Sequence, residues 1–182
     1  MNNYEKFKEK AEAVQGIVTK IKSLDEAFLY VEDVFKNNDF KNKTLAVPFF
    51  DEKALSDASD SLKKSGISVV TKDLRNQKEG VDVGLTFADF GIAETGTLVI
   101  DSSKEDLRLA TMLSQIHVAV LPESQMKEKT EDIENELNAV LSKDAAYLAF
   151  ITGASRTADI ERVLALGVHG PFELHILVYE GV

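Results

Sequence analysis

The fold class is decided by two short apolar runs, Thr44-Leu45-Ala46-Val47-Pro48-Phe49 and Ile67-Ser68-Val69-Val70-Thr71. Both have the β-branched and aliphatic composition of buried strands. Between them, the apolar residues of 55–62 are spaced as one face of a helix, and Gly66 is placed to end that helix. The order of strand, helix and strand predicts a βαβ unit.

Outward from this unit, strand-like and helical patterns keep alternating. Further strands are predicted at residues 81–87, 97–100, 116–121, 147–151 and 174–179, and helices at 105–113, 128–142 and 156–166, while 88–96 is predicted to be irregular. The alternation predicts an α/β protein with a largely parallel sheet covered by helices. Ligands of such sheets bind where strands end, so the loops that follow strands are the first candidates for a site.

The N-terminal 40 residues have two helical patterns of their own. Apolar residues recur with helical spacing from Phe7 to Ile21, and Ser23 followed by Glu26 indicates a capping box that opens a second helix over 24–35. We therefore expect a helical hairpin in residues 1–40, ahead of an α/β body in 41–182. The hairpin would pack on the body or contact a partner, and residues 1–182 would form one domain.

Composition narrows the classes of function. The chain has 182 residues, with 21 basic and 31 acidic side chains, a net charge of −10 and no cysteine. The negative charge argues against nucleic acid as a partner, because nucleic-acid binding depends on Lys and Arg. Without cysteine, this chain offers no thiol nucleophile and no cysteine-ligated cluster. No apolar run reaches the roughly 18 residues of a membrane span, and we expect a cytoplasmic protein.

One candidate loop is the Arg156 segment (residues 152–161), which begins Thr152-Gly153-Ala154-Ser155-Arg156-Thr157-Ala158-Asp159. Gly153 permits a tight turn, Ser155 and Thr157 supply hydroxyls, and Arg156 offers a bidentate guanidinium. With the N–H groups of the predicted helix start, they could hold a carboxylate or a phosphate. In the alternative, Ser155 or Thr157 only caps the helix and Asp159 complements its dipole.

A second candidate is the His169 segment, Gly167-Val168-His169-Gly170-Pro171. A histidine held between turn residues could bind a ligand or transfer a proton near neutral pH. In the alternative, the segment is only a turn in which His169 bonds to the backbone. His117 and His175 fall within predicted strands without the spacing of a metal site, so we expect both to be structural.

The third candidate is the Glu94 segment (residues 93–99), which contains Glu94-Thr95-Gly96-Thr97 just before a strand. Glu94 could act as an acid, base or nucleophile if burial raised its pKa. In the alternative, it bonds to local N–H groups and to the hydroxyls of Thr95 or Thr97. The glycine motifs of dinucleotide-binding proteins, P-loop NTPases and α/β-hydrolases are absent from the chain.

Together, the Glu94, Arg156 and His169 segments resemble the lactate-utilisation (LUD) domain family in order, spacing and position. The resemblance runs from about residue 40 to the end of the chain. It implies a fold like that of sugar-phosphate isomerases and CoA-transferases. It also implies a role beside two iron–sulfur partner proteins in the oxidation of L-lactate to pyruvate. Iron–sulfur clusters would then be held by the partners, with no cofactor in this chain.

The resemblance favours one shared site. Arg156 would bind a carboxylate or phosphate, Glu94 or His169 would carry a proton, and Asp159 would orient Arg156. The other residues expected at or around this site are Gly153, Ser155, Thr157, Thr95, Gly96, Thr97 and Gly170. The leading hypothesis is an accessory subunit of a lactate-oxidising iron–sulfur system. The competing hypothesis is a stand-alone enzyme of the CoA-transferase or sugar-phosphate isomerase type that uses Glu94.

Overall fold

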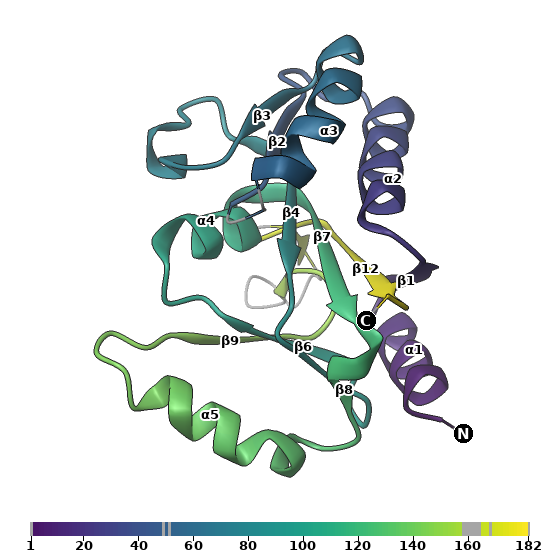
Figure 1. Ribbon diagram of the computed structural model, residues 1–182, viewed down its shortest axis with the longest axis vertical. Helices are drawn as coiled ribbons and strands as arrows, with labels where there is room; N and C mark the ends of the chain where they lie inside the picture. The colour runs from purple at the N-terminus through teal and green to yellow at the C-terminus, as the bar shows by residue number, and fades with distance from the viewer. Residues whose placement is uncertain (1, 49, 51, 158–164, 168, 182) are drawn as a thin grey trace.

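The protein is built around a six-stranded parallel sheet (Figure 1). The computed structural model describes residues 2–48, 50, 52–157, 165–167 and 169–181. The strand order is β1-β12-β7-β4-β2-β3, and every pair is parallel. The strands are β1 (Gly16–Ile21), β2 (Thr44–Ala46), β3 (Ser68–Val70), β4 (Val81–Phe87), β7 (Ser114–Pro122) and β12 (Glu173–Tyr179). The predicted α/β class is confirmed.

A smaller sheet lies against one face of the large one. Its order is β8-β5-β6-β9, with antiparallel pairing of β6 to both β5 and β9. The strands are β5 (Phe90–Ile92), β6 (Thr97–Asp101), β8 (Met126–Lys127) and β9 (Leu148–Ile151). The sequence pattern predicted two of these strands, but it placed β5 in an irregular stretch and did not separate this sheet from the parallel one.

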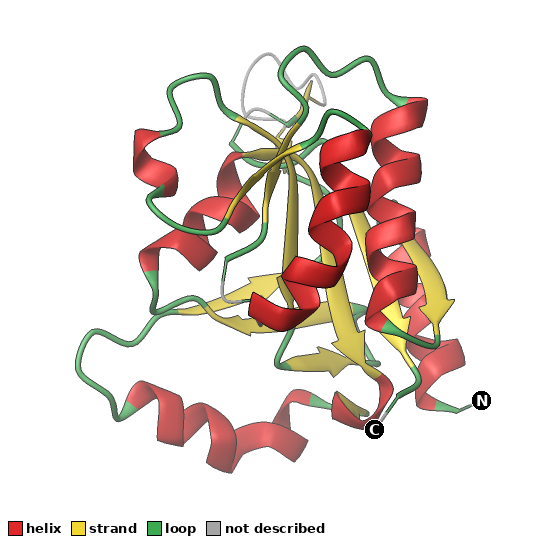
Figure 2. Cartoon of the chain, turned by 45° about the horizontal axis from the view of Figure 1, so that its top comes forward, coloured by secondary structure: helices red, strands yellow, loops and turns green. Residues whose placement is uncertain are grey.

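Helices complete the layers on both sides (Figure 2). Helices α2 (Leu24–Asn37) and α3 (Glu52–Lys64) cover one face of the large sheet. Helices α1 (Asn3–Ala13) and α4 (Glu105–Leu113) lie on the other face with the small sheet, and α5 (Glu134–Leu141) packs outside that sheet. Short 3₁₀ turns occupy Leu74–Asn76, Glu123–Gln125 and Thr130–Ile133.

The predicted N-terminal helical hairpin is wrong. Helix α1 ends at Ala13, Gln15 has a left-handed φ of 67°, and the chain then enters strand β1 at Gly16. On this strand Val18 and Ile21 point to opposite faces of the sheet, and each is buried in the core on its own side. Residues 16–21 form a strand and not a helix because the strand pairs with β12 and buries apolar side chains on both faces of the sheet. An exposed helix could not bury both sets of side chains.

The second predicted helix and its N-cap are confirmed, but the reciprocal bond of the predicted capping box goes to Lys22 and not to Ser23. Ser23 is the N-cap of α2, and its hydroxyl accepts a hydrogen bond from the N–H of Glu26 at 3.3 Å. The Glu26 carboxylate accepts from the N–H of Lys22 at 2.8 Å. The cap therefore satisfies two N–H groups where β1 gives way to α2.

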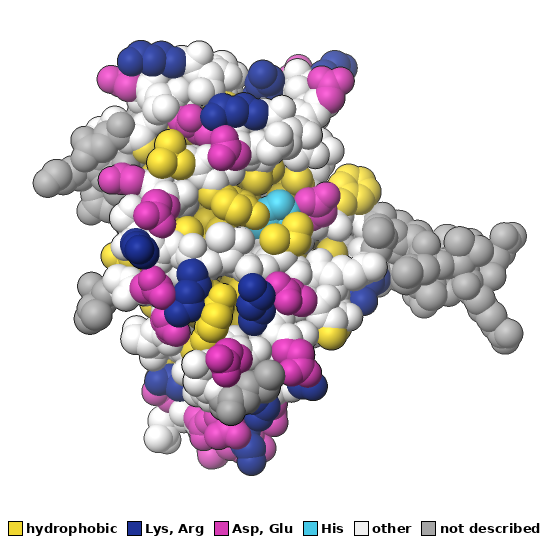
Figure 3. All heavy atoms as spheres, turned by 90° about the vertical axis from the view of Figure 1, so that its right-hand side faces the viewer, with side chains coloured by type: hydrophobic (Ala, Val, Ile, Leu, Met, Phe, Trp, Pro, Cys, Tyr) yellow, Lys and Arg dark blue, Asp and Glu magenta, His cyan; other side chains and the backbone are white. Residues whose placement is uncertain are grey.

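Charged side chains are spread over the surface. Figure 3 shows acidic and basic side chains interspersed on one face, with apolar side chains gathered between them. None of the helices among the described residues combines the length and apolar character that a membrane span requires.

Candidate functional site

A cleft of about 360 Å³ opens beside β9, where the small sheet meets α4 and β7. Its walls come from α4, β7, β9 and the Arg156 and His169 segments. The lining residues are Ser102, Arg108, Thr111, Met112, His117, Tyr147, Ala149, Phe150, Ile151, Thr152, Gly153, Ala154, Ser155, Arg156, His169, Gly170, Pro171 and Leu174. Two of the three segments predicted from sequence thus border one cavity.

Direct contacts join the three segments. The N–H of Ser155 donates to the carbonyl of Pro171 at 2.9 Å, which fixes the Arg156 segment to the His169 segment. A Cβ added at Gly170 would lie 3.1 Å from the Cβ of Ser155, so the Arg156 and His169 segments are in contact. The hydroxyls of Thr97 and Thr152 are 2.7 Å apart, which ties the Glu94 segment to the same loop.

Gly153 lets this loop rest on the end of α1. Its φ is +71°, in the left-handed region, and an added Cβ would run into the carbonyl oxygen of Val14, the C-cap of α1. A side chain at this position would therefore be strained by the backbone and would also displace the loop. The glycine predicted to form a tight turn also sets the position of the cleft wall.

The predicted helix over 156–166 is wrong at both of its ends. Arg156–Thr157 forms strand β10, Ala165–Leu166 forms strand β11, and the two pair in antiparallel fashion. Residues 158–164, including Asp159, lie outside the described residues, as does the side chain of Thr157. No helix begins at Arg156, so the expected anion cradle of helix N–H groups is not formed there.

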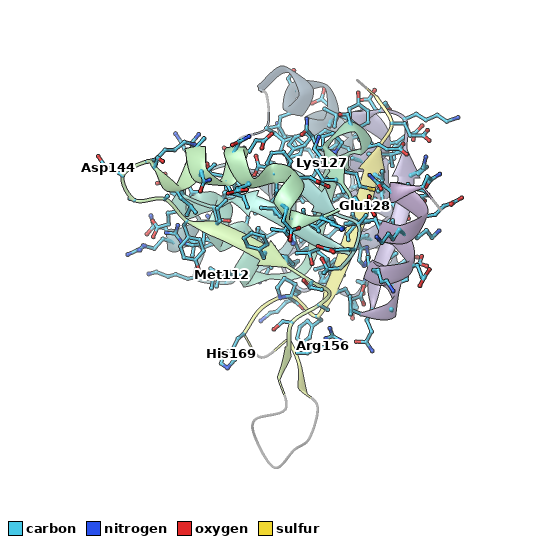
Figure 4. All side chains as sticks on the ribbon, turned by 90° about the horizontal axis from the view of Figure 1, so that it is seen from below. Met112, Lys127, Glu128, Asp144, Arg156 and His169 are labelled. Atoms are coloured by element: carbon cyan, nitrogen blue, oxygen red, sulfur yellow. The ribbon has the colours of Figure 1, made fainter. Side chains whose placement is uncertain are left out.

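Arg156 and His169 lie at the same end of the molecule, near Met112 (Figure 4). Both side chains are exposed, and both border the cleft. Arg108 on α4 also borders the cleft, and its Nη1 donates to the carbonyl of Ser102 at 2.7 Å. The Arg108 guanidinium also lies 5.3 Å from the ring centroid of Tyr147. The cleft therefore has basic groups on two of its walls.

Acidic side chains are missing from this lining. Among the described residues that border the cleft none is Asp or Glu, although the chain has 31 of them. Two arginines line the cavity, and no carboxylate accompanies them among the lining residues that the structure describes. Because a guanidinium binds carboxylates and phosphates through paired N–H donors, the cleft is suited to a small anion.

Glu94 does not join this cleft. It is half-buried, its carboxylate accepts from the N–H of Thr130 at 3.4 Å, and its own N–H donates to the carbonyl of Glu128 at 3.0 Å. In Figure 4, Glu128 lies well apart from Arg156 and His169. The structure does not bring Glu94 together with Arg156, and a catalytic role for Glu94 stays a prediction.

The remainder of the Glu94 segment supports the local architecture. The hydroxyls of Thr95 and Thr97 are 2.7 Å apart, and a chain of hydroxyls continues from there to Thr152. Gly96 has a φ of +66° and packs directly on the backbone of α1. These residues hold the cleft wall in place but do not line the cavity.

His117, which the sequence analysis expected to be a structural histidine, also lines the cleft. It lies on β7, is 1% exposed, and places Nε2 2.8 Å from the hydroxyl oxygen of Thr86. Burial, with a smaller contribution from the charge of His175, lowers its pKa from 6.5 to about 4. The imidazole is therefore neutral at physiological pH. Its only sequence signal was a polar residue in an otherwise apolar strand.

Exposed apolar side chains also line the cleft. Met112, Tyr147 and Phe150 are each about half exposed and belong to its lining. Over the described part of the chain, no group of three or more His, Asp and Glu side chains is arranged to hold a metal ion. Neither Arg108 nor Tyr147 was predicted at the site, because α4 and the start of β9 have no sequence feature that distinguishes them from ordinary surface elements.

The LUD domain model matches residues 4–179, nearly the whole chain. The chain belongs to the LUD domain family. This LUD domain is 38% identical over 104 residues to lactate utilization protein C of Bacillus subtilis, covering 55% of this chain and 43% of that protein. It is 34% identical over 110 residues to the protein of the same name from Halalkalibacterium halodurans, covering 59% of this chain and 48% of that protein. The matched part spans less than half the length of these relatives.

The fold of this LUD domain has a counterpart among solved structures. A DUF162 family protein from Deinococcus radiodurans superimposes with a TM-score of 0.64 over 99% of both chains. The sequence identity is 16%, so this likeness concerns the fold alone.

Proposed function

We propose that this LUD domain takes part in lactate utilisation and binds a small carboxylate in the cleft beside β9. The observation that carries the proposal is the charge of the lining, which has two arginines and His169 but no described acidic residue in a chain of net charge −10. The names of the relatives support lactate or its oxidation product as the carboxylate. Both are small enough for a cavity of about 360 Å³.

The domain acts in this proposal as an accessory subunit beside iron–sulfur proteins that transfer the electrons. This chain has no cysteine, so cysteine-ligated clusters would be held by the partners. The half-exposed Met112, Tyr147 and Phe150 in the lining of the cleft place hydrophobic surface near the proposed anion, where a partner could cover it.

Ligand binding is tested by calorimetry and thermal shift with L-lactate, pyruvate, phosphate, sugar phosphates and CoA. We expect L-lactate and pyruvate to raise the melting temperature. We expect Arg156→Ala to weaken their binding by about tenfold, in keeping with the loss of a hydrogen bond to a charged group. Arg75→Ala is the matched control, because Arg75 is also exposed but forms an ion pair with Glu105 away from the cleft. Equal effects of the two substitutions, or no binding by the wild type, would contradict the proposal.

Partnership is tested separately by affinity capture from the cells that produce the protein, under anaerobic and reducing conditions. We expect a cysteine-rich protein with the absorption spectrum of an iron–sulfur cluster to be recovered. Failure to recover such a protein, with the bait folded and abundant, would count against the accessory role while leaving the carboxylate site intact.

A further inference from the structure

His117 faces the cleft from the floor of the large sheet. Side chains alternate along β7, and Val118 and Val120 belong to the core under α2 and α3. His117 and Ala119 therefore point to the opposite face, toward the small sheet and α4. Directly across from His117 on β4 stands Gly84, which has no side chain to cover the ring.

One ring nitrogen of His117 is unpaired. Nε2 is 2.8 Å from the Thr86 hydroxyl, whereas Nδ1 has no hydrogen-bond partner among the described residues. Every fully buried side-chain nitrogen or oxygen in the described structure has a partner. Nδ1 must therefore reach accessible space, and the described cavity that His117 lines is the cleft. A buried polar atom that opens into a binding cavity is placed to meet a ligand.

The Thr86 hydroxyl allows Nδ1 to change its role. A neutral imidazole has one N–H and one lone pair, and a hydroxyl can donate or accept. When Thr86 donates to Nε2, Nδ1 carries the hydrogen and donates into the cleft. When Nε2 donates to Thr86, Nδ1 presents its lone pair to the cleft. The first arrangement suits a carbonyl oxygen of a ligand, and the second suits a hydroxyl group.

We propose that His117, backed by Thr86, binds the oxygen on carbon 2 of a 2-hydroxy or 2-oxo carboxylate whose carboxylate group is held by the arginines of the cleft. This inference rests on the proposed function and assigns a specificity role within it. The low pKa of His117 supports it, because a protonated ring would have no lone pair to offer a hydroxyl group. His117 thereby gives L-lactate and pyruvate a higher affinity than propionate, which has the same carbon chain without the oxygen on carbon 2.

The test compares the affinities of L-lactate, pyruvate and propionate by calorimetry. In the wild type we expect L-lactate and pyruvate to bind about three- to tenfold more tightly than propionate, as for one net hydrogen bond between neutral groups. His117→Phe keeps a ring but no nitrogen, and it should reduce the affinities of L-lactate and pyruvate to that of propionate while leaving the affinity of propionate unchanged. His117→Asn keeps a polar atom near the Nδ1 position and should preserve part of the difference.

A measurement on the wild-type protein tests the role of His117 without depending on the folding of any variant. In imidazole ¹⁵N NMR spectra, L-lactate and pyruvate should shift the Nδ1 signal of His117 in opposite directions, and propionate should leave it unchanged. Equal binding of the three acids by the wild type, or an equal loss of all three affinities in His117→Phe, would overturn the role of His117 alone. Absence of binding for all three would overturn the proposed function as well.

Discussion

Replacing Gly96 by alanine should lower the stability of the domain far more than a typical surface change. Gly96 has a φ of +66°, and its position is buried in the turn before β6. An added Cβ would lie 2.7 Å from the carbonyl carbon of Lys10 and 2.8 Å from the Cα of Ala11, both on α1. Those are backbone atoms, so no side-chain rotation relieves the overlap, and α1 must move away from the small sheet.

Two costs add in this variant. The left-handed conformation costs alanine about 1–2 kcal/mol. Displacing packed structure costs about 1–3 kcal/mol more. The free energy of unfolding should therefore fall by about 2–5 kcal/mol in total, which for a chain of this size lowers the melting temperature by about 4–20 °C.

Gly80→Ala supplies the matched control. Gly80 has a φ of +84° with nothing within 4 Å of an added Cβ, so only the conformational cost applies. Calorimetric unfolding of both variants isolates the contribution of the contact with α1, and hydrogen exchange should show faster exchange in α1 only for Gly96→Ala. If Gly96→Ala loses no more stability than Gly80→Ala, the close packing of α1 on this turn is refuted.

Three further predictions concern acidity, capping and Glu94. Because the pKa of folded His117 is about 4 against 6.5 for an exposed ring, the unfolded chain takes up a proton first as the pH falls. The free energy of unfolding should then drop by about 3 kcal/mol between pH 6.5 and pH 4, and urea titrations should show a smaller drop for His117→Phe. Ser23→Ala should lower the free energy of unfolding by about 1 kcal/mol in the same urea titrations, because Ser23 caps α2. An unchanged urea midpoint would contradict this prediction. Glu94→Gln should change the affinity for L-lactate by less than about twofold relative to the wild type, because Glu94 lies outside the cleft. A larger loss of affinity would indicate that Glu94 contributes to the binding site.

Periodicity predicted the parallel sheet but could not place the N-terminal segment. Ile17, Val18 and Ile21 continue the spacing of helix α1, whereas in strand β1 Val18 and Ile21 lie on opposite faces of the sheet. The deciding contribution comes from β12, which is distant in sequence and offers a paired edge. A stronger local signal was the β-branched run that follows Gln15-Gly16, since β-branched residues favour strands.

The same limit applies to the helix predicted over residues 156–166. The spacing of Ile160, Val163 and Leu166 favoured a helix, whereas Leu166 pairs with Arg156 across β10 and β11. Strand pairing of this kind depends on which residues a turn brings opposite each other. Local helical spacing carries no information about that pairing.

The site was predicted best where loops build it. Gly153, Ser155, Arg156, His169 and Gly170 were expected together and border one cleft. The contributions of α4 and β7 were not expected, because Arg108 and His117 point into the cleft only through the register of their elements, which a single sequence does not specify.

The position of β1 has a consequence for how the chain is made. Gly16 lies opposite Leu174, so strand β1 pairs with a strand that is synthesised much later. Until residues 173–179 have emerged, β1 has no partner in the sheet. Its apolar residues stay unpaired while the residues between β1 and β12 are synthesised. The large sheet is therefore completed only after β12 has emerged, and a nascent chain halted before β12 would expose both β1 and the edge of β7 to other proteins.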